Sequence, residues 1–361
     1  MLHYDSLMTP DQPLSEECSP PGSKTMLLTL ETSGLSPRNS FVIMGGAGCR
    51  LSDGWHQTIL IAENRRDEAA LLQRLHDMLS GAETLYLFGY HTFFKRFINE
   101  RWENITGGAS DFFDPKLTII DLQYRLKKIR SLLPLTSLSR HEIENSLGYK
   151  RSAPQTGREI AQIYGEYQQK GSTGVPNELL LHLQEDLMSY FSISALESYP
   201  LFFDGQFEPD RQKPFEIIDD QLHIYASAVR AFPFPLSHTD EYREIKLEQS
   251  KITVTVPLYF GKLKFFYPGS PSDYFYLPEE DRAIHKSLGM FVDKKHRIRA
   301  TRATCYTTRE GLFLKCPVPS GFSSLFYTDY NKPPAYIAYE PEKWQTSPDD
   351  LKRYMQQIIN C

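Results

Sequence analysis

The chain has 361 residues and a formal net charge of −5; 40% of its residues are hydrophobic and 24% are charged. These values are typical of a globular protein with one large or two medium domains, and they exclude a generally cationic nucleic-acid-binding protein. Any contact with nucleic acid must then come from a local basic patch. No apolar run approaches the roughly 18 residues that span a bilayer, so we expect no membrane partner.

The cysteines indicate a reducing compartment. Their number is five, they form neither a CxxC pair nor a zinc-binding spacing, and no signal peptide precedes them. We therefore predict free thiols and a cytoplasmic location.

The N-terminal half combines a strand meander with alternating strands and helices. Residues 1–23 are rich in Pro, Ser and acidic residues, so we predict a disordered tail there. Three strands are predicted over 24–32, 40–51 and 55–63. Next come a helix over 66–81, a strand over 83–90, a helix over 92–102 and a strand over 116–126 that runs into a helix. Ser139 and Glu142 form a capping box, and 176–199 reads as a long helix. This order predicts a mixed α/β sheet with helices on its faces, over residues 24–204.

Residues 205–361 have a different pattern and are predicted to form a smaller α+β domain. Alternating β patterns occur over 251–260, 262–268, 311–318 and 335–340. A single helix is predicted between them, over 277–297.

The stretch LLTLETSGL, residues 27–35, carries the first candidate for chemistry. An apolar strand presents Glu31 just before a Ser-Gly turn, which is a common way to expose a metal ligand. Taken alone, Glu31 is more typical of an ordinary strand-end glutamate. His182 and Asp186 lie four residues apart on the long helix, a spacing that also describes a local surface pair. Hydrolysis of phosphodiesters by two metal ions would require several such carboxylates to converge.

Residues 25–200 resemble the YprB-type ribonuclease H-like domain, a branch of the DEDD 3′–5′ exonuclease superfamily. The matching segments are LTLETSGLSPRNSFVIMGG, LFGYHTFFKRFINER, IIDLQYRL, TSLSRHEIENSLGYKR and HLQEDLMSYFSISAL. The resemblance implies a ribonuclease H-like mixed sheet and an exonuclease-type site for Mg²⁺ or Mn²⁺.

The family's acidic residues are only partly present. Glu31 matches the glutamate of the first motif and Asp186 the last aspartate, with His182 one helical turn before it. Thr29 and Phe94 stand where the family has its other two aspartates. The resemblance therefore implies a degenerate site, with Glu31, His182 and Asp186 as its remnants. We expect no bound cofactor, and Mg²⁺ or Mn²⁺ on Glu31 and Asp186 only if residual nuclease activity exists. Phe94 is expected to pack in the core, and Asp121 to cap a helix.

A basic segment in the C-terminal domain is the candidate nucleic-acid contact. Seven Lys and Arg residues against Asp281 and Asp293 give residues 281–302 a local charge of +5. The predicted contact residues are Lys286, Lys294, Lys295, Arg297, Arg299 and Arg302. Tyr274, Phe275, Tyr276, Phe291 and Tyr306 are expected stacking partners for a single strand. The alternative is a solvated basic helix face.

These features favour an exonuclease-related protein that binds single-stranded DNA or RNA after losing most of its catalytic carboxylates. Two alternatives remain open. One is a weak metal-dependent 3′–5′ exonuclease that uses the remaining carboxylates. The other is a non-catalytic scaffold that binds a protein partner.

Overall fold

The computed structural model describes residues 1–8, 20, 22, 24–108, 110–152, 156–170, 174–316, 319 and 322–360. Two compact units divide the chain. Unit 1 consists of Met1–Pro200 with Arg230–Pro233, and unit 2 of Leu201–Val229 with Phe234–Cys361. The first division lies close to the domain boundary that we predict between residues 204 and 205.

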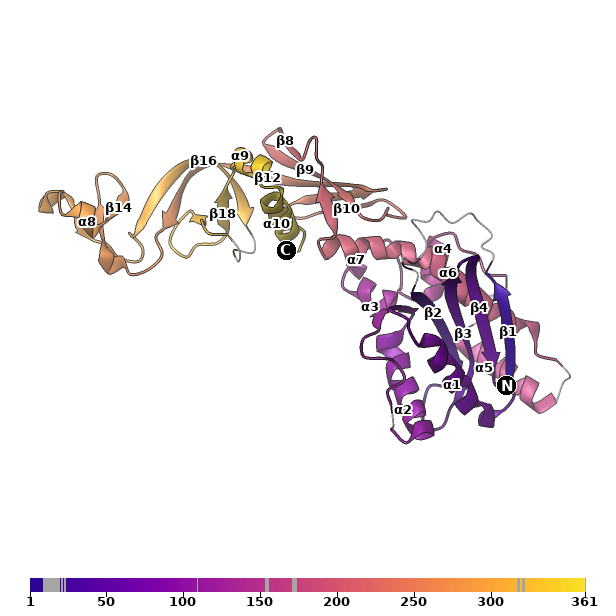
Figure 1. Ribbon diagram of the computed structural model, residues 1–361. Helices are drawn as coiled ribbons and strands as arrows, with labels where there is room; N and C mark the ends of the chain where they lie inside the picture. Colours follow the sequence, from indigo (N-terminus) through magenta and orange to yellow (C-terminus); the bar gives the residue numbers. More distant parts are fainter. Residues whose placement is uncertain are drawn as a thin grey trace. The chain divides into compact units, whose positions relative to one another are not determined.

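In the described part of unit 1, six strands form one mixed sheet in the order β1-β4-β3-β2-β5-β6 (Figure 1). The strands are β1 Leu2–Leu7, β2 Thr25–Thr32, β3 Val42–Leu51, β4 Gly54–Ile61, β5 Thr84–Leu87 and β6 Thr118–Ile120. The pairs β1/β4, β4/β3 and β3/β2 are antiparallel, whereas β2/β5 and β5/β6 are parallel. The predicted meander and the predicted mixed sheet are both confirmed.

Helices cover both faces of this sheet. α1 Glu68–Leu79 and α2 Lys95–Thr106 pack on one face, and α5 Gly157–Lys170 and α6 Asn177–Ile193 on the other. The other helices of this part of the chain are α3 Leu122–Lys127, α4 Arg140–Ser146 and α7 Ser198–Phe203, and α7 spans the division between the two units. One buried cluster joins α1 and α2 to the sheet through residues such as Leu28, Leu60 and Leu75. A second cluster joins α5 and α6 to the opposite face through Ile59 and Leu183, among others. Because Ile59 and Leu60 are neighbours on β4, the two-residue period of the strand separates the two cores.

The predicted N-terminal tail is wrong for residues 2–7. These residues form strand β1, which pairs with β4 from Leu2 opposite Ile61 to Leu7 opposite His56. Most β1 side chains are exposed, so backbone hydrogen bonds to β4 hold the strand and no hydrophobic pattern marks it. The Met1 amino group also pairs with Glu63 and Asp67. Residues 9–19, 21 and 23 of the predicted tail lie outside the described residues.

The described part of unit 2 is rich in strands. One sheet contains β7 Phe207–Pro209, β8 Phe215–Ile218, β9 Gln221–Ala228, β10 Leu236–Thr239, β11 Glu244–Glu248, β12 Lys251–Phe266, β16 Tyr306–Cys316, β17 Phe326–Tyr327 and β18 Ala335–Ala338. A smaller sheet has the order β14-β13-β15, with β13 Tyr274–Leu277, β14 Arg282–His285 and β15 Ile298–Arg299. The helices are α8 Lys286–Gly289, α9 Pro341–Thr346 and α10 Pro348–Ile359.

The predicted helix over 277–297 is wrong. Residues 274–285 form the antiparallel hairpin β13/β14, in which Leu277 lies opposite Arg282. The turn requires a left-handed backbone at Asp281, whose φ is 50°, and Asp is one of the residues that tolerates this conformation. The sequence around this turn has a helical pattern, which is why a long helix is predicted. The helix that forms, α8, has only four residues.

Two further expectations concern the whole chain. No helix in the described ranges is long and apolar enough to cross a membrane. Cys49, Cys305 and Cys316 form no disulfide with a described residue, while Cys18 and Cys361 lie outside the described residues.

Candidate functional site

Strand β2 directs its residues alternately to the two cores of unit 1. Leu28 and Leu30 pack with α1 and α2 in the first cluster. The alternation therefore directs Thr29 and Glu31 to the other face, where α6 packs. Gly46 on β3 lies opposite Thr29, and a Cβ there would stand 3.1 Å from a methyl group of Leu187 on α6. The absence of a side chain at Gly46 thus lets α6 approach the sheet beside Thr29.

Helix α6 brings the remaining motif residues to this face. The Thr29 hydroxyl donates a hydrogen bond of 2.5 Å to Oδ2 of Asp186. His182 Nε2 lies 2.9 Å from Oε1 of Glu31. A ligand atom from each of Glu31, His182 and Asp186 falls within 4.8 Å of the others. The structure therefore assembles four of the five motif positions that sequence reasoning singled out.

Two arginines that sequence reasoning did not single out occupy the same place. Arg151 donates from one nitrogen to Oδ1 of Asp186 at 2.6 Å and to Oε1 of Glu144 at 2.7 Å. A second Arg151 nitrogen lies 2.7 Å from the other oxygen of Glu144. Arg140 lies 3.5 Å from Oδ2 of Asp186 and also donates to the Asp186 main-chain carbonyl.

These arginines are buried with their acidic partners. Only 7% of the Arg151 side chain and 1% of the Glu144 side chain are exposed. The Arg140 guanidinium lies 4.5 Å from the centre of the Tyr190 ring and 3.2 Å from Glu144. Two guanidinium groups and one imidazole thus face three carboxylates in a place with little water, where each charge depends on its partners.

The pKa of Asp186 reflects this arrangement. Burial alone would raise the pKa, but the charges of Arg140, His182 and Arg151 and the hydrogen bond from Thr29 outweigh it. The pKa of Asp186 consequently lies well below its ordinary value of 3.8. The carboxylate stays ionised because two guanidinium groups hold it.

The pKa of His182 moves in the opposite direction. Burial favours the neutral ring, but the hydrogen bond with Glu31 and the charges of Asp186 and Glu31 outweigh burial, while Arg151 opposes them. The net effect raises the pKa of His182 above 6.5. His182 Nδ1 is buried and accepts or donates no hydrogen bond to any described residue.

The donor set does not fit a pair of divalent ions. Mg²⁺ needs about six oxygen ligands at roughly 2.0–2.1 Å, and a two-ion site needs carboxylates that bridge the ions. Within the described ranges, Glu31, His182 and Asp186 are the one cluster with three suitable donors. Both Asp186 oxygens are already engaged, Oδ1 by Arg151 and Oδ2 by Thr29. Glu31 is the one carboxylate of this cluster that no guanidinium contacts among the described residues.

The remaining motif position, Phe94, and the predicted cap Asp121 have structural roles. Phe94 packs against the first core cluster, and its ring lies 5.1 Å from that of Phe93, as expected for core packing. No contact in the described part of the chain joins Phe94 to Glu31 or Asp186. Asp121 caps α3 by accepting from the Tyr124 amide, and it also accepts from the Gly89 and His91 amides. The predicted cap is confirmed.

The predicted nucleic-acid contacts lie in unit 2, on residues 286–302, which we call the basic tip. Lys294, Lys295, Arg299 and Arg302 are exposed, and none forms an ion pair with a described residue. Arg297 differs from them. It donates to the Gly289 carbonyl, and its guanidinium lies 4.6 Å from the Phe275 ring centre. Lys286 lies on the same ring, at 5.9 Å.

Most of the expected stacking aromatics are already engaged. Tyr274 stacks on Tyr267 with ring centres 4.9 Å apart and planes 8° apart. The Tyr276 and Tyr306 hydroxyls both donate to Asp281. Phe291, in contrast, is 89% exposed. Three tyrosines and Phe275 thus contribute contacts to the hairpin itself, and the multi-ring stacking surface stays a prediction.

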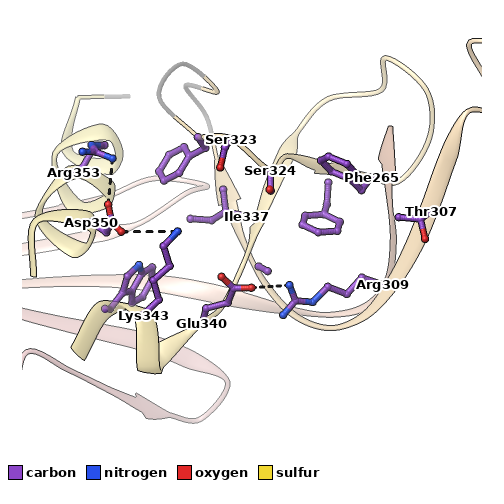
Figure 2. A pocket seen from close by; sticks show the side chains of 14 residues that line it. Phe265, Thr307, Arg309, Ser323, Ser324, Ile337, Glu340, Lys343, Asp350 and Arg353 are labelled. Atoms are coloured by element: carbon purple, nitrogen blue, oxygen red, sulfur yellow. Dashed lines mark hydrogen bonds and ion pairs between the residues drawn. The ribbon is translucent and has the colours of Figure 1, made fainter. Parts of the chain in front are cut away.

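Unit 2 also contains a cavity of about 530 Å³ (Figure 2). Its apolar wall includes Phe265, Phe326 and Trp344. Its charged side chains pair with one another, Arg309 with Glu340 at 2.7 Å and Arg353 with Asp350 at 3.2 Å. Lys343 lies 3.9 Å from Asp350. None of the motif residues of unit 1 lines this cavity.

Comparison with known proteins identifies the class of unit 1. Residues 26–196 match the family described as the RNase_H superfamily. This segment therefore belongs to the ribonuclease H superfamily, and the predicted ribonuclease H-like fold is confirmed. No curated protein matches the chain. The finer assignment to the YprB type stays a prediction.

Similar solved structures include the family B DNA polymerase from the hyperthermophilic archaeon Pyrobaculum calidifontis, with 14% identity and a TM-score of 0.38. The match covers 74% of this chain and 40% of the polymerase. Exonuclease I has 12% identity and a TM-score of 0.29, and an ExoI/SSB-Ct complex has 12% and 0.28. Each of these two matches covers 62% of this chain and 55% of the other. The chain thus spans about half or less of each of these proteins.

Replacing Arg151 tests the buried charge cluster. Arg151→Met keeps much of the side-chain volume but leaves Arg140 as the one described guanidinium that contacts both Glu144 and Asp186, at the longer distances of 3.2 and 3.5 Å. Breaking a buried ion pair from one side costs about 3–5 kcal/mol, so we expect a loss of that size in the free energy of unfolding. Urea unfolding of the full chain measures it. Arg158→Met, at an exposed position on α5, is the matched control. If the free energy of unfolding falls no more in Arg151→Met than in the control, Arg151 does not stabilise the buried charge cluster.

Replacing His182 tests the raised pKa. Because the folded-state pKa lies above 6.5, ionised His182 contributes stability that is fully present below that value and is lost as the pH rises through the folded-state pKa. The difference in free energy of unfolding between the wild type and His182→Gln should therefore narrow as the pH rises from below 6.5 through the folded-state pKa. His141→Gln, at an exposed position on α4, should show no such trend. A difference that widens with pH would refute the raised pKa.

Proposed function

We propose that this chain is a ribonuclease H-like protein that binds nucleic acid without cleaving it. The observation that carries the proposal is the contact of Arg151 with Asp186, at 2.6 Å, in the place where the family resemblance leads us to expect metal ligands. A covalently attached guanidinium there balances the negative charge that a divalent ion would otherwise balance. Both the degenerate metal site and the lack of a cofactor are part of the proposal, as is the predicted cytoplasmic location.

Binding is assigned to the basic tip of unit 2. Lys294, Lys295, Arg299 and Arg302 are exposed and free of described ion pairs, so their charges are available to phosphate oxygens. We remove Lys286 and Arg297 from the principal contacts because both lie against Phe275. The net charge of −5 makes this local positive charge the main source of attraction to a polyanion.

Two other functions compete with this proposal. A weak 3′–5′ exonuclease would use Glu31 and Asp186 with one Mg²⁺ or Mn²⁺ ion. The contacts of Asp186 with Arg151 and Thr29 argue against it. A protein-interaction scaffold would keep the fold and bind neither metal nor nucleic acid.

Salt dependence tests the binding. If four lysine and arginine side chains contact a single strand, a plot of log affinity against log salt concentration has a slope of about −3. The affinity then falls roughly 50-fold from about 50 to about 200 mM salt. Fluorescence anisotropy of labelled single strands, DNA and RNA, measures it. Reversing Lys294, Lys295, Arg299 and Arg302 to Glu should abolish binding, whereas Arg38→Glu in unit 1 should not. Absent or salt-independent binding by the wild type to both single strands and duplexes would favour the scaffold.

A cleavage assay tests the loss of catalysis. Strands labelled at the 3′ or the 5′ end should stay intact with millimolar Mn²⁺ or Mg²⁺, because the residues at Asp186 leave no open ligand position. Gel electrophoresis after long incubation is the measurement. Trace cleavage that is equal in the wild type and Glu31→Ala indicates a contaminating nuclease. Cleavage that disappears in Glu31→Ala supports the exonuclease alternative instead.

A further inference from the structure

The basic tip exposes an apolar surface that the proposed function does not explain. Leu288, Met290, Phe291 and Ile298 are exposed to 64%, 69%, 89% and 53%. Three of them lie within four consecutive residues, on the last turn of α8 and directly after it. Exposed apolar side chains are common singly, but a group of them rimmed by charged residues marks an interaction surface.

The backbone that carries these side chains is held in place. His285 Nδ1 accepts from the Ser287 amide at the start of α8, and Asp293 accepts from the Lys295 amide after it. Arg297 donates to the Gly289 carbonyl between them. Gly289 itself packs so closely on Phe275 that a Cβ would stand 2.5 Å from a ring carbon. The exposed side chains therefore project from a fixed turn, which lowers the entropy lost on binding.

Charge restricts the partner to an anionic one. Lys294 and Lys295 come three and four residues after Phe291, beyond Val292 and the exposed Asp293, and Arg299 neighbours Ile298. All three are exposed and without a described acidic partner. A partner must therefore combine an apolar surface with negative charges beside it.

The kinds of apolar side chain decide between the anionic partners. Leu288, Met290 and Ile298 are aliphatic, so they cannot form the aromatic stacking that single-strand binding surfaces use. Leu, Met, Ile and Phe side chains are the ones that enter between base pairs of a duplex, where they partly unstack a step and kink it. Leu288 on α8 and Met290 and Phe291 directly after it are few enough to suit one or two base steps. Stable attachment to a bilayer usually needs a longer amphipathic helix or a second anchor.

We propose that the basic tip inserts Met290 and Phe291, supported by Leu288, between the base pairs of duplex nucleic acid, while Lys294, Lys295 and Arg299 contact the flanking phosphates. This inference rests on the proposed function and changes its preferred ligand from a single strand to a deformable duplex. We call the inserted side chains, Leu288, Met290 and Phe291, the wedge. Arg299 on β15 is one of the phosphate contacts beside it.

The test uses the full chain and a short DNA duplex that carries 2-aminopurine, whose fluorescence rises when its neighbours unstack. A matching RNA duplex forms a second arm. We expect the wild type to raise the fluorescence at least twofold at saturation. The variant Leu288→Ser/Met290→Ser/Phe291→Ser should bind with less than a tenfold loss of affinity but give no rise. These positions are exposed, so the substitutions should leave the fold intact. Phe260→Ser, at a 70% exposed position on β12, is the matched control and should behave as the wild type.

Each other outcome overturns the inference in a distinguishable way. Binding by the wild type without a fluorescence rise removes the wedge and leaves the proposed function standing. A fluorescence rise that persists in the triple variant also excludes insertion by these three side chains. No binding to any duplex or single strand means that the proposed function itself has failed. Vesicles of phosphatidylserine and phosphatidylcholine form a last arm: if the triple variant loses vesicle binding but keeps the fluorescence rise, the apolar residues serve a lipid surface instead.

Discussion

The buried pairing of Arg151 with Asp186 and Glu144 is the interaction on which the candidate site depends. Both acidic side chains are nearly inaccessible, and ionised carboxylates in such a place are stable only with nearby cations. In a metal-dependent nuclease those cations would be divalent ions taken from solution. Here the chain supplies them itself, from Arg151 and from Arg140 on α4. These ion pairs join α4 to α6, and the Thr29–Asp186 hydrogen bond joins α6 to β2, so the charge cluster also holds these elements together.

Thr29 fits this arrangement. An aspartate there would place a second carboxylate against Asp186, at a separation where like charges repel strongly unless a cation lies between them. The hydroxyl instead donates a hydrogen bond to Asp186. In our proposal, the change at Thr29 and the guanidinium of Arg151 therefore belong together. One removes negative charge and the other replaces the missing positive charge. The ribonuclease H-like sheet is unaffected, because it depends on the alternation of apolar residues and not on the acidic ones.

The sequence predicts the sheet and part of the site well, for identifiable reasons. Strand alternation along β2 and helical spacing along α6 are local patterns, and together they place Glu31, His182 and Asp186 on facing elements. Arg140 and Arg151 could not be found in this way, since a guanidinium paired across the fold reads in sequence as an ordinary surface cation. Their one sequence feature is that both lie in the family-matching segment TSLSRHEIENSLGYKR, Arg140 at the start of α4 and Arg151 after its end. Strand β1 was missed because its pairing is a backbone property, and the hairpin β13/β14 because Asp281 turns a helix-like stretch back on itself.

Metal binding by the wild type and by one double variant tests the central claim most directly. Thr29→Asp/Arg151→Gln restores the family's aspartate and removes the guanidinium that contacts Asp186. Mn²⁺ titration followed by electron paramagnetic resonance reports bound ion without any need for activity. The account predicts no stoichiometric Mn²⁺ binding by the wild type and a new site in the folded double variant that is lost on adding Asp186→Asn. Stoichiometric Mn²⁺ binding by the wild type that disappears in Asp186→Asn would contradict it.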